Sequence, residues 1–142
     1  MTVRITVETP VNPTEDEDKV IRSLHNIFPE TSVQRIRLDN GMKVRLTGNG
    51  LSFLATLRSL IKQDRIRSAA RAVILRRTEE GRIEFYLNKQ AAFAGRASFC
   101  GPIGESPQGP IRVEIISDNT LNVVDYLAAI PGQAGYRRFH ET

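Results

Sequence analysis

The chain has few or none of several residue types on which familiar protein functions depend. Its 142 residues include one cysteine, Cys100, no tryptophan, three tyrosines and six phenylalanines. A single cysteine excludes an internal disulfide and a cysteine-rich zinc site. No apolar run reaches the roughly eighteen residues that a membrane helix needs, and the N-terminus has no secretory hydrophobic stretch. We therefore expect a cytoplasmic protein with no membrane segment.

Residues suited to catalysis or metal binding are equally sparse. His25 and His140 have no cysteine, histidine or carboxylate set at metal-ligand or triad spacing, and no serine has a nucleophile-elbow context. The carboxylate run Glu15–Asp18 could bind a metal ion. It stands at a predicted helix start, however, where it complements the helix dipole and points around the helix rather than converging. We expect no catalytic residues, no cofactor and no metal site.

Positive charge is concentrated in the middle of the chain. The formal net charge is +4, yet residues 31–77 contain eleven cations and only two anions, a net +9. Residues 1–30 and 78–142 carry −3 and −2. We call residues 31–77 the basic block. Such a block favours a polyanionic partner, although charge runs often form only a solvated surface.

Hydrophobic periodicity predicts a mixture of strands and helices. Alternation marks strands at 3–7 and 83–87, and residues 93–100 and 111–116 resemble two more. Helical spacing marks 14–28, with Thr14 and Glu17 as a capping box, and 119–129, with Asp118 or Asn119 as the cap. In the middle, the apolar stripes of 51–61 and 66–74 differ in direction by roughly 150°, so we expect a break near Gln63–Arg65.

This order of elements defines the predicted fold class. The pattern β-α-β-β-α-α-β-β-β-α indicates an α+β protein, a single two-layer domain over residues 1–130 in which helices pack on one face of a mixed β-sheet. Residues 131–142 are expected to form a mobile C-terminal tail. An irregular loop is expected where prolines and glycines gather between 101 and 110.

A hairpin is predicted within the basic block. Apolar residues alternate with cations on both sides of the turn Asp39-Asn40-Gly41. A three-residue loop with Gly41 in the left-handed position pairs Leu38 with Met42 and gives one clean apolar face. In that register four cations share the opposite face and repel one another, namely Arg35, Arg37, Lys43 and Arg45.

Two short polar segments allow both a structural and a binding interpretation. Gly48-Asn49-Gly50 is typical of a plain turn, although glycines before a helix can also contact a phosphate. Asn88-Lys89-Gln90 fits a hairpin or bulge that fixes the sheet. It also fits a recognition loop in which Lys89 meets a phosphate.

Several motifs resemble a known family over nearly the whole chain. They are the helix start Pro13–Glu17, the run Phe85–Phe93 (FYLNKQAAF), Gly109-Pro110-Ile111 and Asp125–Ala128. The chain is similar to a small archaeal family of uncharacterised proteins labelled RNA-binding and sometimes exosome-subunit-like. The resemblance implies an α+β fold similar to the ribosomal protein that binds 5S ribosomal RNA. Gln108 and Tyr126 depart from the family pattern, where leucine and tryptophan are expected.

These observations predict a non-catalytic RNA-binding protein. Few aromatics are available for stacking, and the strand signature of base-stacking RNA-recognition domains is absent, which favours contacts to the phosphates of structured RNA. An alternative is a protein-interaction or assembly module, such as a homodimer or a member of an RNA-processing complex, whose basic face pairs with an acidic partner. The predicted phosphate contacts are Arg35, Arg37, Lys43, Arg45, Arg58, Lys62, Arg65, Arg67, Arg71 and Lys89.

Overall fold

The computed structural model of the chain describes residues 1–29, 31–39, 41–102 and 109–130. The predicted tail at 131–142 and the departure at Gln108 lie outside the described residues. So does most of the predicted irregular loop before Gly109.

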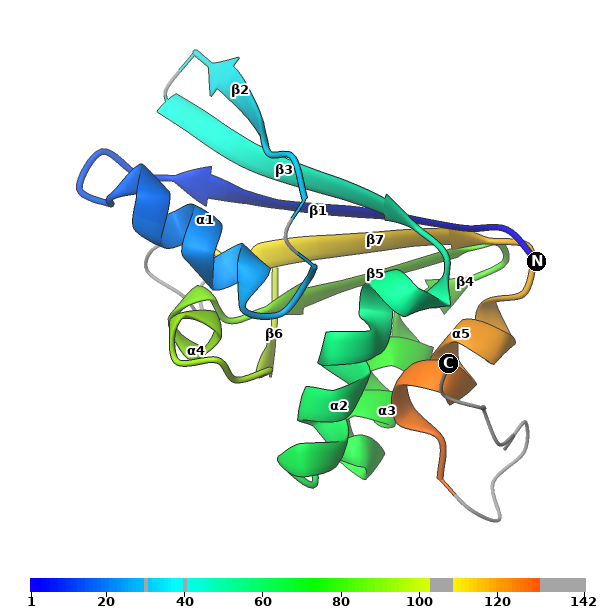
Figure 1. Cartoon of the computed structure of the whole chain (residues 1–142). Helices are drawn as coiled ribbons and strands as arrows, with labels where there is room; N and C mark the ends of the chain where they lie inside the picture. The colour runs from blue at the N-terminus through cyan, green and yellow to red at the C-terminus, as the bar shows by residue number, and fades with distance from the viewer. Residues whose placement is uncertain (30, 40, 103–108, 131–142) are drawn as a thin grey trace.

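The described residues form seven strands, five α-helices and one 3-10 helix (Figure 1). They occur in the order β1 (Val3–Val11), α1 (Glu17–His25), β2 (Gln34–Leu38), β3 (Gly41–Asn49), η1 (Leu51–Leu54), α2 (Ala55–Gln63), α3 (Arg67–Arg76), β4 (Thr78–Glu79), β5 (Arg82–Leu87), α4 (Lys89–Phe93), β6 (Phe99–Cys100), β7 (Ile111–Ser117) and α5 (Thr120–Ala128).

The strands join into one sheet with the order β2-β3-β1-β7-β5-β4, and the short β6 pairs with β5. Every pairing among the described strands is antiparallel, whereas the sequence had led us to expect a mixed sheet. The first and last long strands, β1 and β7, lie side by side at the centre. The two ends of the described domain are therefore tied together by a continuous ladder.

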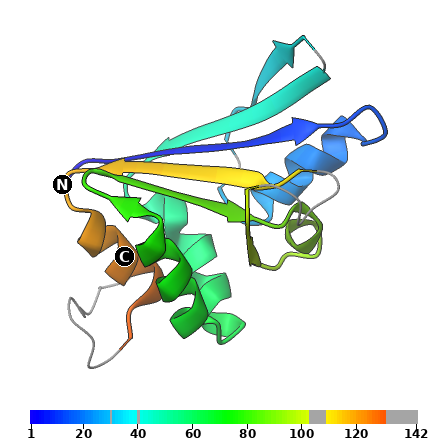
Figure 2. The same ribbon diagram turned by 180° about the vertical axis from the view of Figure 1, so that it is seen from behind.

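One face of the sheet is covered by helices and the other is open (Figures 1 and 2). Strand alternation produces this difference: in β1, Val3, Ile5 and Val7 are buried while Arg4 is exposed. Strands β5 and β7 alternate in the same way. The predicted α+β fold with two layers and helices on one face is confirmed.

The helices form two groups beneath the sheet. Helix α1 packs with α4, while α2 and α3 both pack with α5. Helices α2 and α3 run away from the sheet and back, so their connection lies at the end of the pair that is distant from the sheet (Figure 1). The predicted break near Gln63–Arg65 is confirmed, because α2 ends at Gln63 and α3 begins at Arg67.

Several local predictions were wrong about element boundaries. Helix α1 starts at Glu17, and its cap is Asp16, which accepts a hydrogen bond from the Asp18 amide; Thr14 lies before the helix. Residues 93–100 are not one strand, because Phe93 ends α4 and only the last two residues pair with β5. At α5 the cap is Asn119, one of the two predicted candidates.

The two ambiguous polar segments both have structural roles. Asn88 caps α4 by accepting a hydrogen bond from the Ala91 amide. Gly48 belongs to β3, where the Phe53 ring lies so close that a Cβ would stand 2.1 Å from it. Gly50, at φ 82°, then turns the chain into η1. Glycine is therefore needed at 48 for space and at 50 for backbone conformation.

Candidate nucleic-acid interface

The hairpin formed by β2 and β3 has a different register from the predicted one. Leu38 pairs with Gly41, Arg37 with Met42 and Arg35 with Val44. The shift of one residue moves the β2 side chains to the other face relative to those of β3. Arg35 and Arg37 therefore share the face of Val44, toward the helices, whereas Lys43 and Arg45 lie on the open face. The predicted surface of four repelling cations does not exist.

On the open face the cations are paired with carboxylates from neighbouring strands. Glu8 of β1 lies between Arg45, at 3.0 Å, and Arg112, at 3.2 Å, and Lys43 approaches it to 3.4 Å. Arg112 also contacts Glu114 at 3.0 Å. Further pairs extend this network across β5 to Arg82 and Glu84. Much of the positive charge of the open face is thus neutralised within the protein.

The network also shifts the acidity of its carboxylates. Burial raises the pKa of Glu8, but the hydrogen bond from Arg45 and the charges of the surrounding cations outweigh it, so the pKa lies below its ordinary value. The pKa of Glu84 is lowered in the same way, with burial opposed by hydrogen bonds from Tyr86 and Arg112. Both carboxylates are therefore ionised, and the sheet cations keep their partners at neutral pH.

Two predicted phosphate contacts are wrong because the side chains are buried. Lys89 has no exposed side-chain surface, and its Nζ donates to the Pro10 carbonyl at 2.7 Å and to Glu15 at 3.0 Å. Burial lowers the pKa of Lys89, against the opposing effect of Glu15. Arg71 is 3% exposed and donates to Asp125 at 2.9 Å, joining α3 to α5. Neither side chain can reach a phosphate while the domain is folded.

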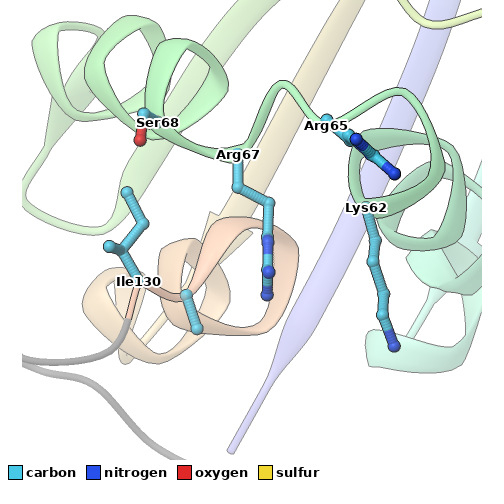
Figure 3. Close-up of a pocket in the computed structure, with 6 residues that line it drawn as sticks. Lys62, Arg65, Arg67, Ser68 and Ile130 are labelled. Carbon is cyan, nitrogen blue, oxygen red and sulfur yellow. The ribbon is translucent and has the colours of Figure 1, made fainter.

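Three more of the predicted phosphate contacts, Lys62, Arg65 and Arg67, come together at the connection between α2 and α3 (Figure 3). A pocket of about 250 Å³ lies there, which we call the corner pocket. In Figure 3, Lys62 from α2 and Arg67 from α3 extend in the same direction, and Ile130 after α5 forms the opposite side. Its lining consists of Lys62, Arg65, Arg67, Ser68, Ala129 and Ile130.

Among the described residues, no carboxylate forms an ion pair with the cations of the corner pocket. Lys62, Arg65 and Arg67 are exposed, and within the described part of the chain none of them takes part in an ion pair. None of the described residues that line the pocket is a carboxylate. Arg58, one turn before Lys62, lies over the Tyr126 ring at 4.8 Å, so the family departure at Tyr126 provides a surface for a predicted contact residue.

Arg65 adopts a backbone conformation that is unusual for its type. Its φ is 58°, and it is the only residue other than glycine with a positive φ in the described ranges. The Ile66 amide donates a hydrogen bond to the Ile61 carbonyl, and the Arg65 amide donates one to the Lys62 carbonyl. Helices that end with these two hydrogen bonds usually have glycine at the position that Arg65 occupies here. An arginine there costs about 1–2 kcal/mol. Strained backbone conformations cluster at active and ligand-binding sites, so Arg65 is a candidate binding residue.

A second cationic pocket lies at the other end of α3, which sequence reasoning did not single out. It has a volume of about 340 Å³ and is lined by Val73, Arg76, Arg77, Phe99, Cys100 and Gly101. Arg77 lies over the Tyr86 ring at 5.6 Å. The two arginines were visible as part of the basic block, but nothing local in the sequence indicated that β6 would pack beside them.

Neither a metal site nor a membrane helix emerges from the structure. In the ranges listed above, no three histidine, cysteine, aspartate or glutamate side chains lie close enough together to hold an ion. No helix among those residues is both long and apolar enough to cross a bilayer.

Comparisons with known proteins place this fold in a family. Residues 4–116 match the model of a family described as RNA binding. The chain is 40% identical to a UPF0201 protein of Pyrobaculum arsenaticum over 129 residues, which cover 90% of this chain and 89% of the relative. It is 37% identical to that of Aeropyrum pernix, covering 89% and 85%.

Solved structures agree with this placement. A UPF0201 protein from Methanococcus jannaschii superposes with a TM-score of 0.78 at 29% identity, covering 88% of this chain and 98% of that one. A second uncharacterised UPF0201 protein gives a TM-score of 0.74 at 32% identity, covering 88% and 92%. The chain belongs to the archaeal UPF0201 family, whose domain carries the description RNA binding.

Proposed function

We propose that this protein is a non-catalytic RNA-binding protein that holds structured RNA by its phosphates, mainly at the corner pocket. The observation that carries the proposal is that Lys62, Arg65 and Arg67 form no ion pair with any described residue, in contrast to the paired cations of the sheet. The family description supports RNA as the polyanion. The similarity to the 5S-RNA-binding ribosomal protein stays a prediction.

Physical chemistry favours the corner over the sheet as the phosphate site. A cation that already contacts a carboxylate must lose that contact, or share it, before it can bind a phosphate. An unpaired, exposed cation exchanges only water and counterions, and release of those counterions drives binding. The connection between α2 and α3 also lies at the end of the helix pair that is distant from the sheet (Figure 1).

The test compares two sets of three charge removals. In the first variant, Lys62, Arg65 and Arg67 become alanine; in the matched control, Lys43, Arg45 and Arg82 become alanine. Both lose three positive charges. We expect the first variant to reduce the slope of log affinity against log salt by up to about three and to weaken binding of a structured RNA uniformly across sequences. The control should change the slope by less than about one.

Two results would contradict the proposal. One is an affinity of the wild-type protein for structured RNA that hardly changes between low and moderate salt. The other is equal weakening by the two triple variants, which would mean that internal pairing does not decide which cations meet RNA.

A second candidate function rests on the edge of the sheet. Strand β2 pairs only with β3 among the described strands, and Leu38 at its end is 48% exposed. This edge suits a protein-interaction or assembly module, such as a homodimer, that pairs a basic face with an acidic surface. Light scattering with and without RNA separates the two candidates. A dimer that ignores RNA would favour the assembly function.

A further inference from the structure

We infer that the pocket at the C-terminal end of α3 binds one unpaired nucleotide of the RNA, with its base against Phe99 and its phosphate at Arg76 and Arg77. The inference rests on the proposed function and adds a substrate class to it: structured RNA that carries an unpaired nucleotide beside a helical segment. We call this pocket the nucleotide pocket; its lining is the six residues from Val73 to Gly101 given above.

The size of the pocket distinguishes it from the corner pocket. Ligand pockets in proteins typically measure about 300–1,000 Å³. The nucleotide pocket, at about 340 Å³, reaches this range, whereas the corner pocket, at about 250 Å³, does not. The corner therefore suits a single phosphate group, and the nucleotide pocket has room for a base with its sugar.

The lining combines the two chemistries that a nucleotide requires. Val73 and Phe99 are half-buried and supply an apolar wall, while Arg76 and Arg77 are exposed and supply positive charge. The Phe99 ring packs against the fully buried Phe85, with ring centroids 5.4 Å apart. A supported aromatic surface offers a base a stacking platform at little entropic cost.

Arg77 is held in place before any ligand arrives. Its guanidinium lies over the Tyr86 ring, and its carbonyl accepts a hydrogen bond from the Glu84 amide at the sheet edge. Because its side chain is already ordered, binding a phosphate there loses little rotamer freedom. Tyr86 also donates a hydrogen bond to Glu84 at 2.7 Å, which fixes the ring beneath the arginine.

Helix α3 connects the two pockets without an opposing charge. Its nine steps from Arg67 to Arg76 span about 14 Å, and it contains no acidic residue. Between its ends it exposes the small residues Ser68, Ala69 and Ala72 and one large side chain, Leu75. Figure 2 shows α3 and β6 on the near side of the molecule, below the edge of the sheet. An RNA segment that contacts both pockets must therefore extend about 14 Å along α3.

The other pocket beside these helices does not compete for this role. It measures about 420 Å³ but is lined by Asp64 as well as Arg96, so a carboxylate would face the phosphate. The apolar pocket near Leu38 includes Glu8, which already holds three cations.

The test uses two RNA hairpins that differ by one unpaired adenosine. We expect wild-type protein to bind the bulged hairpin about tenfold more tightly than the fully paired one, as one stacked base allows. Phe99→Leu should bring the two affinities to within about twofold while leaving the salt slope unchanged. Phe93→Leu, a matched control at an exposed phenylalanine outside the pocket, should keep the preference.

A second measurement avoids any effect of Phe99→Leu on folding. With 4-thiouridine at the unpaired position, irradiation of wild-type protein should crosslink the RNA to the peptide that contains Phe99 and Cys100. Crosslinks confined to the peptide of Lys62–Ser68 would contradict the inference.

The outcomes separate the inference from the proposed function. Equal affinity of wild-type protein for the two hairpins, with a steep salt dependence, overturns the nucleotide pocket and leaves phosphate binding standing. Absence of binding to both hairpins overturns both. A preference that survives Phe99→Leu places the unpaired nucleotide elsewhere and also contradicts the inference.

Discussion

The open face of the sheet and the corner pocket both contain lysine and arginine, but among the described residues these cations are paired with carboxylates only on the sheet. On the sheet, Glu8 of β1 lies directly opposite Arg45 of β3 and Arg112 of β7, and it contacts both of them and Lys43. At the corner, Lys62, Arg65 and Arg67 lie around a turn, and no carboxylate is among the described residues that line its pocket. A count of charges cannot distinguish these regions, but the partners of each charge can.

The largest expected effect is a difference in stability between variants of two arginines of α3, which lie four residues apart. Arg71 is buried with Asp125, whereas Arg67 is exposed at the corner. Arg71→Ala leaves a buried carboxylate without its cation and should cost about 3–5 kcal/mol of unfolding free energy. Arg67→Ala should change it by less than about 0.5 kcal/mol. Urea unfolding measures both values.

The ion pair of Arg71 with Asp125 also provides a control. Replacing both Arg71 and Asp125 by apolar residues should restore much of the stability that Arg71→Ala loses, because no charge stays buried without a partner. Similar stability losses from Arg67→Ala and Arg71→Ala would show that the paired and unpaired classes are not distinct.

Arg65→Gly should separate stability from binding at a single position. Glycine adopts a φ of 58° without strain, so the variant should gain about 1 kcal/mol of stability. The lost cation should weaken RNA binding and lower the salt slope by about one. Thermal unfolding and RNA titration on the same sample check the two changes.

Arg65→Ala is the matched control for that experiment. It removes the same charge but keeps a Cβ in the left-handed region, so it should bind RNA as weakly as Arg65→Gly without the gain in stability. If Arg65→Gly bound RNA normally, the strained arginine would have no role in binding.

Glu8→Gln should convert part of the sheet face into a surface like the corner. Without the Glu8 charge, Lys43 and Arg45 lose their carboxylate partner and become available to a polyanion. We expect the affinity for RNA to rise about threefold at low salt. Glu80→Gln, an exposed position in the β4–β5 turn, changes the net charge equally and should raise it less. Equal gains from the two variants would indicate a general charge effect.

The sequence predicted the fold better than the interface, and the reasons are physical. Alternation in β1, β5 and β7 and the changed apolar direction near Gln63–Arg65 are local signals, so the α+β class and the break were found. The pairing of Arg71 with Asp125 joins residues 54 positions apart, and that of Lys89 with Glu15 joins residues 74 apart. No local pattern indicates such partners.

The hairpin shows how one register error changes a functional interpretation. A three-residue loop gave the cleaner apolar face, but β2 is an edge strand whose residues are mostly exposed, so a clean face contributes little there. With Leu38 opposite Gly41, Arg35 instead faces α1 and pairs with Glu17. The predicted four-cation surface was therefore a consequence of the register rather than of the composition.

The smallest expected effect is a loss of stability in acid that originates on the sheet. The pKa of Glu8 lies below 4.5 in the folded protein, and that of Glu84 is lowered as well. Between the folded and unfolded values the unfolded chain binds more protons, so these groups stabilise the fold above about pH 4.5. Their contribution is lost as the pH falls through the folded values. Because the pairs are partly exposed to solvent, we expect a loss of only about 0.5 kcal/mol for each carboxylate.

Glu8→Gln isolates the contribution of one of these carboxylates. It should make the unfolding free energy fall less steeply than in the wild-type protein as the pH is lowered below 4.5, measured by urea unfolding at a series of pH values. Removal of the corner cations should leave the acid dependence unchanged, because none of the described residues that line their pocket is a carboxylate. If the corner variant altered the acid profile as much as Glu8→Gln does, the corner cations would have carboxylate partners after all. The difference between the two regions would then be one of degree.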